Sequence, residues 1–97
     1  MLLKLFTIFD SKAEAFQQPF SAQSTGAAIR MFSDIAQDQK HPIGAHPEDY
    51  TLFEIGTFNP LTAEIKISDA KTPLGTALEH AMPVYSDPDI GDISKVS

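Results

Sequence analysis

The sequence predicts an α+β domain in which a small antiparallel sheet of about four strands packs against one main helix and a second, short helix. Two observations support this fold class. Segments rich in aromatic and β-branched residues, which are typical of strands, occur as two pairs joined by turns. A segment with helical periodicity lies between the two pairs, which favours an antiparallel sheet with its helices on one face.

The first strand is expected over residues 2–9, where both faces are apolar. One face carries Leu3, Leu5 and Phe9, and the other carries Leu2, Phe6 and Ile8. This pattern predicts a central strand covered on one side by a helix and on the other by a partner chain. A second strand is expected over residues 13–22, where Pro19 places it at a sheet edge or breaks it.

The main helix is expected over residues 25–37, with Ser24 as its N-cap. Its apolar positions, Ala28, Phe32, Ile35 and Ala36, fall at helical spacing. Residues 38–49 contain two His-Pro steps and a glycine, and we expect a loop of about twelve residues there. A loop of this length is often functional.

The second pair of strands is expected over residues 50–58 and 63–68, joined by a turn at 59–62 that has Pro60 at its second position. The second of these strands alternates apolar and charged residues, which predicts solvent on one face. Thr72 followed by Pro73 is typical of a helix start, and predicts a short helix that ends before Pro83.

The length of 97 residues indicates one domain, which we place at residues 1–82, followed by a flexible acidic tail over residues 83–97. The absence of cysteine rules out disulfide and thiolate chemistry and agrees with a reducing cytoplasm. No stretch approaches the roughly 20 apolar residues of a membrane helix, so no membrane partner is expected. We interpret the apolar start as a strand and not as a signal peptide.

The loop over residues 38–49 also raises the question of catalysis or metal binding. A metal-dependent enzyme using His41, His46 and Glu48 is one alternative, but their spacing matches no metal motif with a clear geometry. The chain has no nucleophile elbow and no glycine-rich phosphate loop. We therefore expect no enzymatic activity, no metal and no cofactor.

Nucleic-acid binding is the other chemistry to weigh. Single-strand binders stack bases on exposed aromatic rings beside a basic groove. Four aromatic residues lie on periodic apolar faces and are expected in the core: Phe6, Phe9, Phe32 and Phe53. The candidate nucleic-acid-binding residues are the aromatics near strand ends or proline breaks and the scattered bases: Lys4, Lys12, Phe16, Phe20, Arg30, Lys40, Tyr50, Phe58 and Lys66.

The net charge opposes this interpretation, because seven basic and thirteen acidic residues give −6. Nonspecific binding to nucleic acids depends mainly on neutralising phosphates. Each candidate basic residue is also explained simply as a solvated surface charge. A basic groove could form only if folding, or pairing of two protomers, brought these basic residues together.

Three blocks carry a family resemblance: Phe6 to Ala15 (FTIFDSKAEA), Gly26 to Phe32 (GAAIRMF) and His46 to Phe58 (HPEDYTLFEIGTF). Over about residues 3–81 the chain resembles the small nonstructural protein of gokushovirus-type microviruses (Microviridae), phages with circular single-stranded DNA. Members are commonly labelled nonstructural or DNA-binding proteins. The resemblance implies a role in single-stranded DNA synthesis or packaging and carries no catalytic residues.

Two functional hypotheses follow. The first is a noncatalytic phage protein that binds single-stranded DNA during replication or packaging, as a homodimer, in the host cytoplasm. The second is a protein-interaction adaptor without significant DNA affinity, which would act on phage replication or procapsid proteins. The charge of −6 and the acidic tail favour the second hypothesis.

Overall fold

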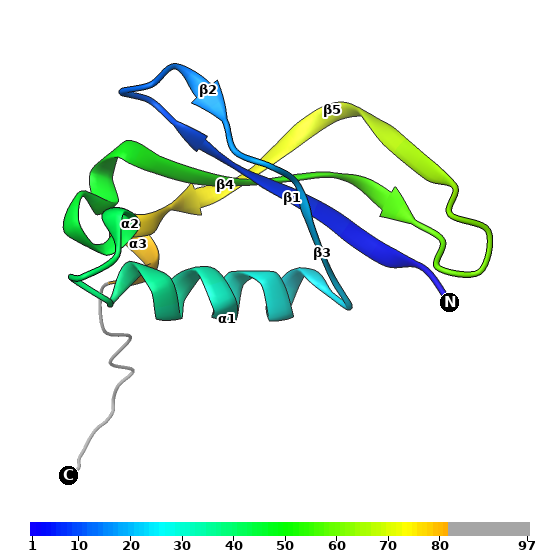
Figure 1. Ribbon diagram of the computed structural model, residues 1–97, viewed down its shortest axis with the longest axis horizontal. Coiled ribbons are helices and arrows are strands. Elements are labelled where there is room, and N and C mark those ends of the chain that lie inside the picture. Colours follow the sequence, from blue (N-terminus) through cyan, green and yellow to red (C-terminus); the bar gives the residue numbers. More distant parts are fainter. Residues whose placement is uncertain (82–97) are drawn as a thin grey trace, which may run out of the picture.

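A five-stranded antiparallel sheet, crossed on one face by a long helix, forms the framework of this protein (Figure 1). The computed structural model describes residues 1–81, so the predicted boundary at residue 82 and the predicted acidic tail lie outside the described residues. The strands are β1 (Leu3–Asp10), β2 (Ala15–Phe16), β3 (Phe20–Ala22), β4 (Tyr50–Phe58) and β5 (Ile65–Thr76). Their order is β2-β1-β4-β5, and β3 also pairs with β1. The predicted fold class is confirmed.

Strand β1 is central, as its two apolar faces predicted. Phe6 and Ile8 point toward the helix side and are buried in the core. On the opposite side, Leu5 and Phe9 are only half-buried. Leu2 was expected to share the face of Phe6, but it precedes the strand and is 56% exposed.

The predicted strand over residues 13–22 is two short pieces, because Pro19 interrupts it as a residue without a backbone N–H. Phe16 in β2 pairs with Phe9, and Phe20 in β3 pairs with Phe6. Between them, the backbone N–H of Gln17 still donates to the carbonyl of Ile8 at 2.8 Å. The chain therefore follows β1 along most of its length.

Helix α1 (Thr25–Ala36) begins as predicted, with the Ser24 hydroxyl accepting a hydrogen bond from the N–H of Ala27 at 3.0 Å. Its buried residues are Ala28, Phe32 and Ala36, at the spacing of one helical face. The core that it forms with the sheet comprises Phe6, Ile8, Ala28, Phe32, Ala36, Ile43, Tyr50, Leu52 and Ala77.

The expectation of an irregular loop over residues 38–49 is wrong. The segment contains helix α2 (Pro42–Ala45) and a 3-10 turn, η1 (Pro47–Asp49), each begun by a proline. The imidazole Nδ1 of His41 accepts a hydrogen bond from the N–H of Ile43 at 3.1 Å and so caps α2. Ile43 is buried in the core and α2 contacts α1, so the segment packs against the domain.

Strand β4 has the predicted bounds, but the elements after it differ from the prediction. Strand β5 extends through Thr72 and Pro73, which were expected to start a helix. Proline is tolerated there because β5 is an edge strand. The short helix α3 (Ala77–Ala81) begins later, after Thr76 and Glu79 form a reciprocal capping box with N···O distances of 2.7 and 3.2 Å. None of the helices within residues 1–81 is long and apolar enough to span a membrane.

Candidate nucleic-acid interface

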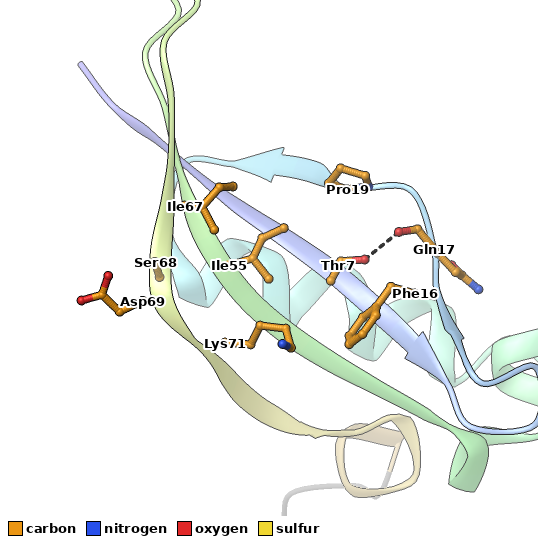
Figure 2. A pocket seen from close by; sticks show the side chains of 9 residues that line it. All are labelled: Thr7, Phe16, Gln17, Pro19, Ile55, Ile67, Ser68, Asp69 and Lys71. Atoms are coloured by element: carbon orange, nitrogen blue, oxygen red, sulfur yellow. Dashed lines mark hydrogen bonds between the residues drawn. The ribbon is translucent and has the colours of Figure 1, made fainter.

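The face of the sheet opposite α1 carries two adjoining hollows, and no helix of residues 1–81 covers it. Figure 2 shows the side chains of the first hollow projecting from one side of the sheet, with α1 behind it. We call this first one the aromatic hollow; its lining residues are Thr7, Phe16, Gln17, Pro19, Ile55, Ile67, Ser68, Asp69 and Lys71. An open sheet face with exposed apolar side chains is a candidate interaction surface.

Phe16 is the centre of an aromatic cluster on this face. Its ring centroid lies 4.8 Å from that of Phe9 and 5.6 Å from that of Phe53, within the range of favourable aromatic contacts. The ammonium group of Lys71 lies 5.6 Å from the centroid of the Phe16 ring, at cation–π distance. Phe16 nevertheless remains 46% exposed, so part of its ring is open to a ligand.

A bulge in β5 brings Lys71 to this position. Ile67 pairs with Gly56 and Thr72 pairs with Glu54, so four residues of β5 lie opposite the single residue Ile55 of β4. Such an irregularity bends the strand and re-aims its side chains. In Figure 2 the Lys71 side chain extends into the hollow near Phe16, whereas the carboxylate of Asp69 points away from it.

The second hollow adjoins the first through Pro19, Ile55 and Ile67, which line both. We call it the aliphatic hollow; its lining residues are Leu5, Pro19, Phe20, Ser21, Ile55, Phe58, Ile65 and Ile67. None of these described residues is charged. Ile65 and Ile67 are 56% and 68% exposed, which is high for two neighbouring isoleucines.

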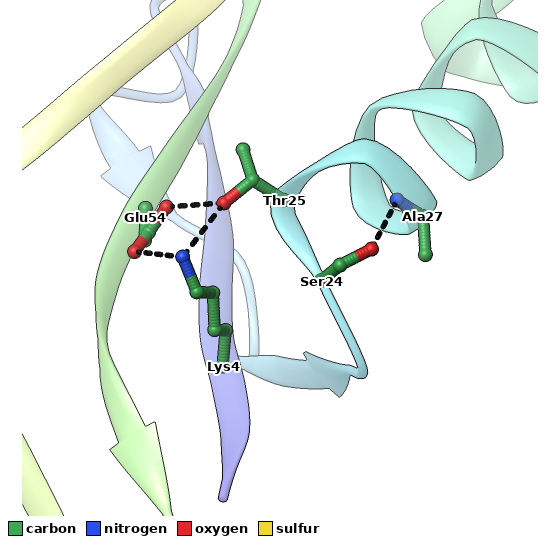
Figure 3. A network of polar contacts seen from close by, with 5 residues as sticks. All are labelled: Lys4, Ser24, Thr25, Ala27 and Glu54. Atoms are coloured by element: carbon green, nitrogen blue, oxygen red, sulfur yellow. Dashed lines mark hydrogen bonds and ion pairs between the residues drawn. The ribbon is translucent and has the colours of Figure 1, made fainter.

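The predicted basic residues are not brought together. Lys4 lies on the helix side of the sheet, where its Nζ is 3.5 Å from Glu54 Oε2 and donates to Thr25 Oγ1 at 3.1 Å (Figure 3). Thr25 in turn donates to Glu54 Oε1 at 2.8 Å, so this network joins β1, β4 and the start of α1. The other four are exposed on separate segments: Lys12, Arg30, Lys40 and Lys66.

The predicted stacking aromatics divide into three environments. Phe16 lines the aromatic hollow, and Phe20 and Phe58 line the aliphatic hollow. The ring of Phe20, however, stacks on Phe6 with centroids 5.7 Å apart and packs against the core on the helix side, so it is not open on the uncovered face. Tyr50 is only 9% exposed and belongs to the core, so its ring is not open to a base. Burial, with the nearby carboxylates of Asp10 and Asp49, raises the pKa of Tyr50.

Sequence reasoning placed Phe9 and Phe53 in the core, and this was wrong, because both lie half-buried on the uncovered face. Alternation along β4 contained the signal: Tyr50 and Leu52 share the buried face, so Phe53 must point to the other side. Lys71 was not a candidate either. No pattern in the sequence predicts the bulge that directs Lys71 toward Phe16.

A small cluster of metal-ligating groups lies where η1 leads into β4. Side-chain ligand atoms of His46, Glu48 and Asp49 lie within 4.8 Å of one another, and His46 and Glu48 are exposed. His41, which the sequence grouped with His46 and Glu48, caps α2 instead. Three such side chains could hold a divalent cation at a solvent-exposed position.

The comparisons with known proteins place the chain within a phage family. Residues 3–80 match the family described as Phage ORF5 protein. No curated protein and no solved structure shows a significant match to the chain. The match covers most of the chain, from β1 to α3. This chain therefore belongs to the phage ORF5 protein family.

Proposed function

We propose that this phage protein binds single-stranded DNA without catalysis, through the aromatic hollow, during genome replication or packaging in the host cytoplasm. One observation carries the proposal: Phe16 is 46% exposed on an uncovered sheet face, with Phe9, Phe53 and Lys71 around it. Single-strand binders combine stacking aromatic rings with a positively charged groove, and here Lys71 supplies a cation beside the ring.

The energies favour a base over the lysine as the partner of the Phe16 ring. An exposed cation–π contact such as that of Lys71 contributes about 0.5–1 kcal/mol. Stacking of one base on an aromatic side chain contributes about 1–3 kcal/mol. A base can therefore displace the ammonium from the ring. Lys71 then reaches a neighbouring phosphate on its flexible four-carbon stem.

Single-stranded DNA fits this site better than duplex DNA. In a duplex the faces of the bases are stacked on one another, and binding depends on phosphate contacts. Residues 1–81 hold six basic and ten acidic residues, and Lys4 is engaged by Glu54. Duplex binding would therefore lack the basic surface that it needs, whereas stacking of an unpaired base on an exposed ring contributes affinity that does not come from phosphate contacts.

The same charge balance favours a second candidate function. A protein that carries ten acidic and six basic residues over its described part is suited to contact proteins. The uncovered apolar face would then bind a phage replication or procapsid protein instead of DNA. This adaptor hypothesis predicts no measurable affinity for an oligonucleotide, which separates it from the first proposal.

Fluorescence anisotropy of a labelled oligothymidylate, titrated with the full chain at low and high salt, tests the proposal. Phe16→Ala removes the platform and should weaken binding by about 5- to 150-fold, the equivalent of one lost stack. Met31→Ala is the matched control, because Met31 is a similarly exposed apolar residue on α1. Equal affinity of the Phe16→Ala variant and the wild type would show that DNA does not bind at the aromatic hollow. Absence of binding by the wild type would support the adaptor hypothesis.

A further inference from the structure

The free edge of β5 is blocked along most of its length. Strand β5 is the last strand of the sheet, and exposed edges readily pair with other chains. The bulge over residues 68–71 interrupts the edge, and Pro73 has no N–H to offer. Bulges and prolines are the usual means of protecting an edge strand. At the far end of β5, side chains of α3 bond the carbonyl of Leu74 and the N–H of Thr76, so Ile65 to Ile67 are the regular part of this edge that stays open.

The backbone polar groups of Ile65 face outward from this edge. The N–H of Asn59 in the turn donates to the carbonyl of Glu64 at 2.9 Å, so this carbonyl points toward β4, while the N–H of Glu64 donates to Thr62 Oγ1 at 3.2 Å. Successive residues of a strand direct their N–H and C=O groups to opposite edges. Ile65 therefore presents one donor and one acceptor to a further strand.

The side chains around Ile65 are suited to pairing with the same strand of a second copy of the chain. Ile65 lies between Glu64 and Lys66, which carry opposite charges, and all three are exposed. We propose that a second copy of this chain pairs its β5 antiparallel with this edge, about a two-fold axis at Ile65. Glu64 then lies opposite the partner's Lys66, and Lys66 opposite the partner's Glu64.

The charges and the position of the bulge favour this pairing register over the registers centred on Lys66 or Ile67. An axis at Lys66 would set two lysines directly opposite each other, which is destabilising. An axis at Ile67 would place Ile65 opposite Asp69 of the partner subunit, inside the bulge. At Ile65, the isoleucine exchanges two hydrogen bonds with its own copy, and two opposite-charge pairs flank them.

The expected dimer is weak. Besides Ile65, the exposed large apolar side chains within residues 59–67 are Leu61 and Ile67, which are 85% and 68% exposed. Burying each removes on the order of 100 Å² of apolar surface. The total stays below the roughly 800 Å² per partner of a standard interface. We therefore expect a dissociation constant on the order of 10–100 μM.

The two-fold axis of such a pair is perpendicular to the sheet, so both uncovered faces lie on the same side of the dimer. Two copies of Phe16 and Lys71 would then share one surface. The dimer itself does not depend on the DNA proposal, because its argument uses only the edge, the charges and the apolar side chains at Ile65.

Sedimentation equilibrium of the full chain, up to about 1 mM protein, tests the pairing with a charge-swap series. Each single reversal, Glu64→Lys or Lys66→Glu, turns both symmetric attractions into repulsions and should weaken the dimer about tenfold. The double variant Glu64→Lys/Lys66→Glu restores the pairs and should return within about threefold of wild type. Arg30→Glu, on the outer surface of α1, is the control for a basic-to-acidic change.

This series separates specific pairing from the effect of net charge. Glu64→Lys lowers the net negative charge and Lys66→Glu raises it, so general repulsion would make the first variant tighter and the second weaker. The proposal requires both to be weaker. A wild type that stays monomeric at about 1 mM, or single reversals that leave the dimer unchanged, would overturn it.

Ile65→Pro provides a second, independent test. Because the N–H of Ile65 faces outward, proline removes the intermolecular donor and leaves the internal ladder intact. Thermal unfolding of this variant should stay within a few degrees of wild type, while the dimer is lost. Retention of the dimer would refute edge pairing. Oligonucleotide binding is measured separately on the same variants, so failure of one proposal is distinguishable from failure of the other.

Discussion

Gly56 in β4 marks the point where β4 and β5 approach most closely. It is buried, and a Cβ added to it would lie 2.2 Å from the carbonyl oxygen of Lys66 and 3.1 Å from its carbonyl carbon. Both are backbone atoms, so no rotamer change can relieve the clash. Gly56→Ala must therefore push β5 away at Ile67, where the bulge that directs Lys71 begins.

The cost follows from two contributions. Overpacking a well-packed site costs about 1–3 kcal/mol. A strand displaced by this clash loses at least one ladder hydrogen bond, which contributes about 1 kcal/mol. The free energy of unfolding should therefore fall by about 2–4 kcal/mol, out of about 5–15 kcal/mol for a domain of this size. The melting temperature should fall by about 10–25 °C.

Thermal and urea unfolding, followed by circular dichroism, measure this loss. Gly26→Ala is the matched control, because its added Cβ would meet only the Ser24 hydroxyl at 3.9 Å. Alanine in a helix is about 1 kcal/mol more favourable than glycine, so Gly26→Ala should stabilise the protein. A Gly56→Ala variant as stable as the wild type would refute the close approach of β4 and β5. A destabilised Gly26→Ala variant would show that the loss is not specific to that contact.

Three further predictions concern single side chains. Lys71→Ala should lower the salt dependence of oligonucleotide binding by about 0.7 in the slope of log K against log salt, measured by anisotropy, because one phosphate contact is lost. Tyr50→Phe should make the protein less sensitive to alkali. The raised pKa of Tyr50 means that the native state holds its proton while the unfolded state releases it near pH 10, so wild-type stability falls as pH rises through that value. Urea unfolding at pH 8 and about pH 10.5 should show the wild type losing stability relative to the variant. Thr76→Ala removes one half of the capping box and should cost about 1 kcal/mol, measured as a shift of the urea midpoint.

Patterns that involve neighbouring residues predicted the first part of the fold well. Ser24 and the apolar face of α1 fixed the main helix, and the alternation of residues 50–58 gave β4 with its observed bounds. Pro19 correctly predicted the interruption between β2 and β3. These signals are local, since a cap, a period of 3.6 or 2, and a missing N–H all act within a few residues.

The errors arose where tertiary contacts outweigh local preference. Thr72 and Pro73 read as a helix start, but pairing with Glu54 and Phe53 holds them in β5. The capping box that starts α3, at Thr76 and Glu79, is a local signal that the sequence also contains. Lys71 could not have been singled out, because its place beside Phe16 depends on the register of β4 against β5.

The acidic charge of this chain distinguishes two ways of holding DNA. If phosphates dominated, binding would need several cations on one face, and in residues 1–81 the aromatic hollow offers Lys71 alone. Its contribution to the salt slope is about −0.7 for a single strand. If stacking dominates, affinity depends on Phe16 and its neighbours and survives in moderate salt. A shallow salt slope together with a large loss for Phe16→Ala is therefore the signature of this site. A steep slope would instead indicate phosphate contacts with basic residues outside the aromatic hollow.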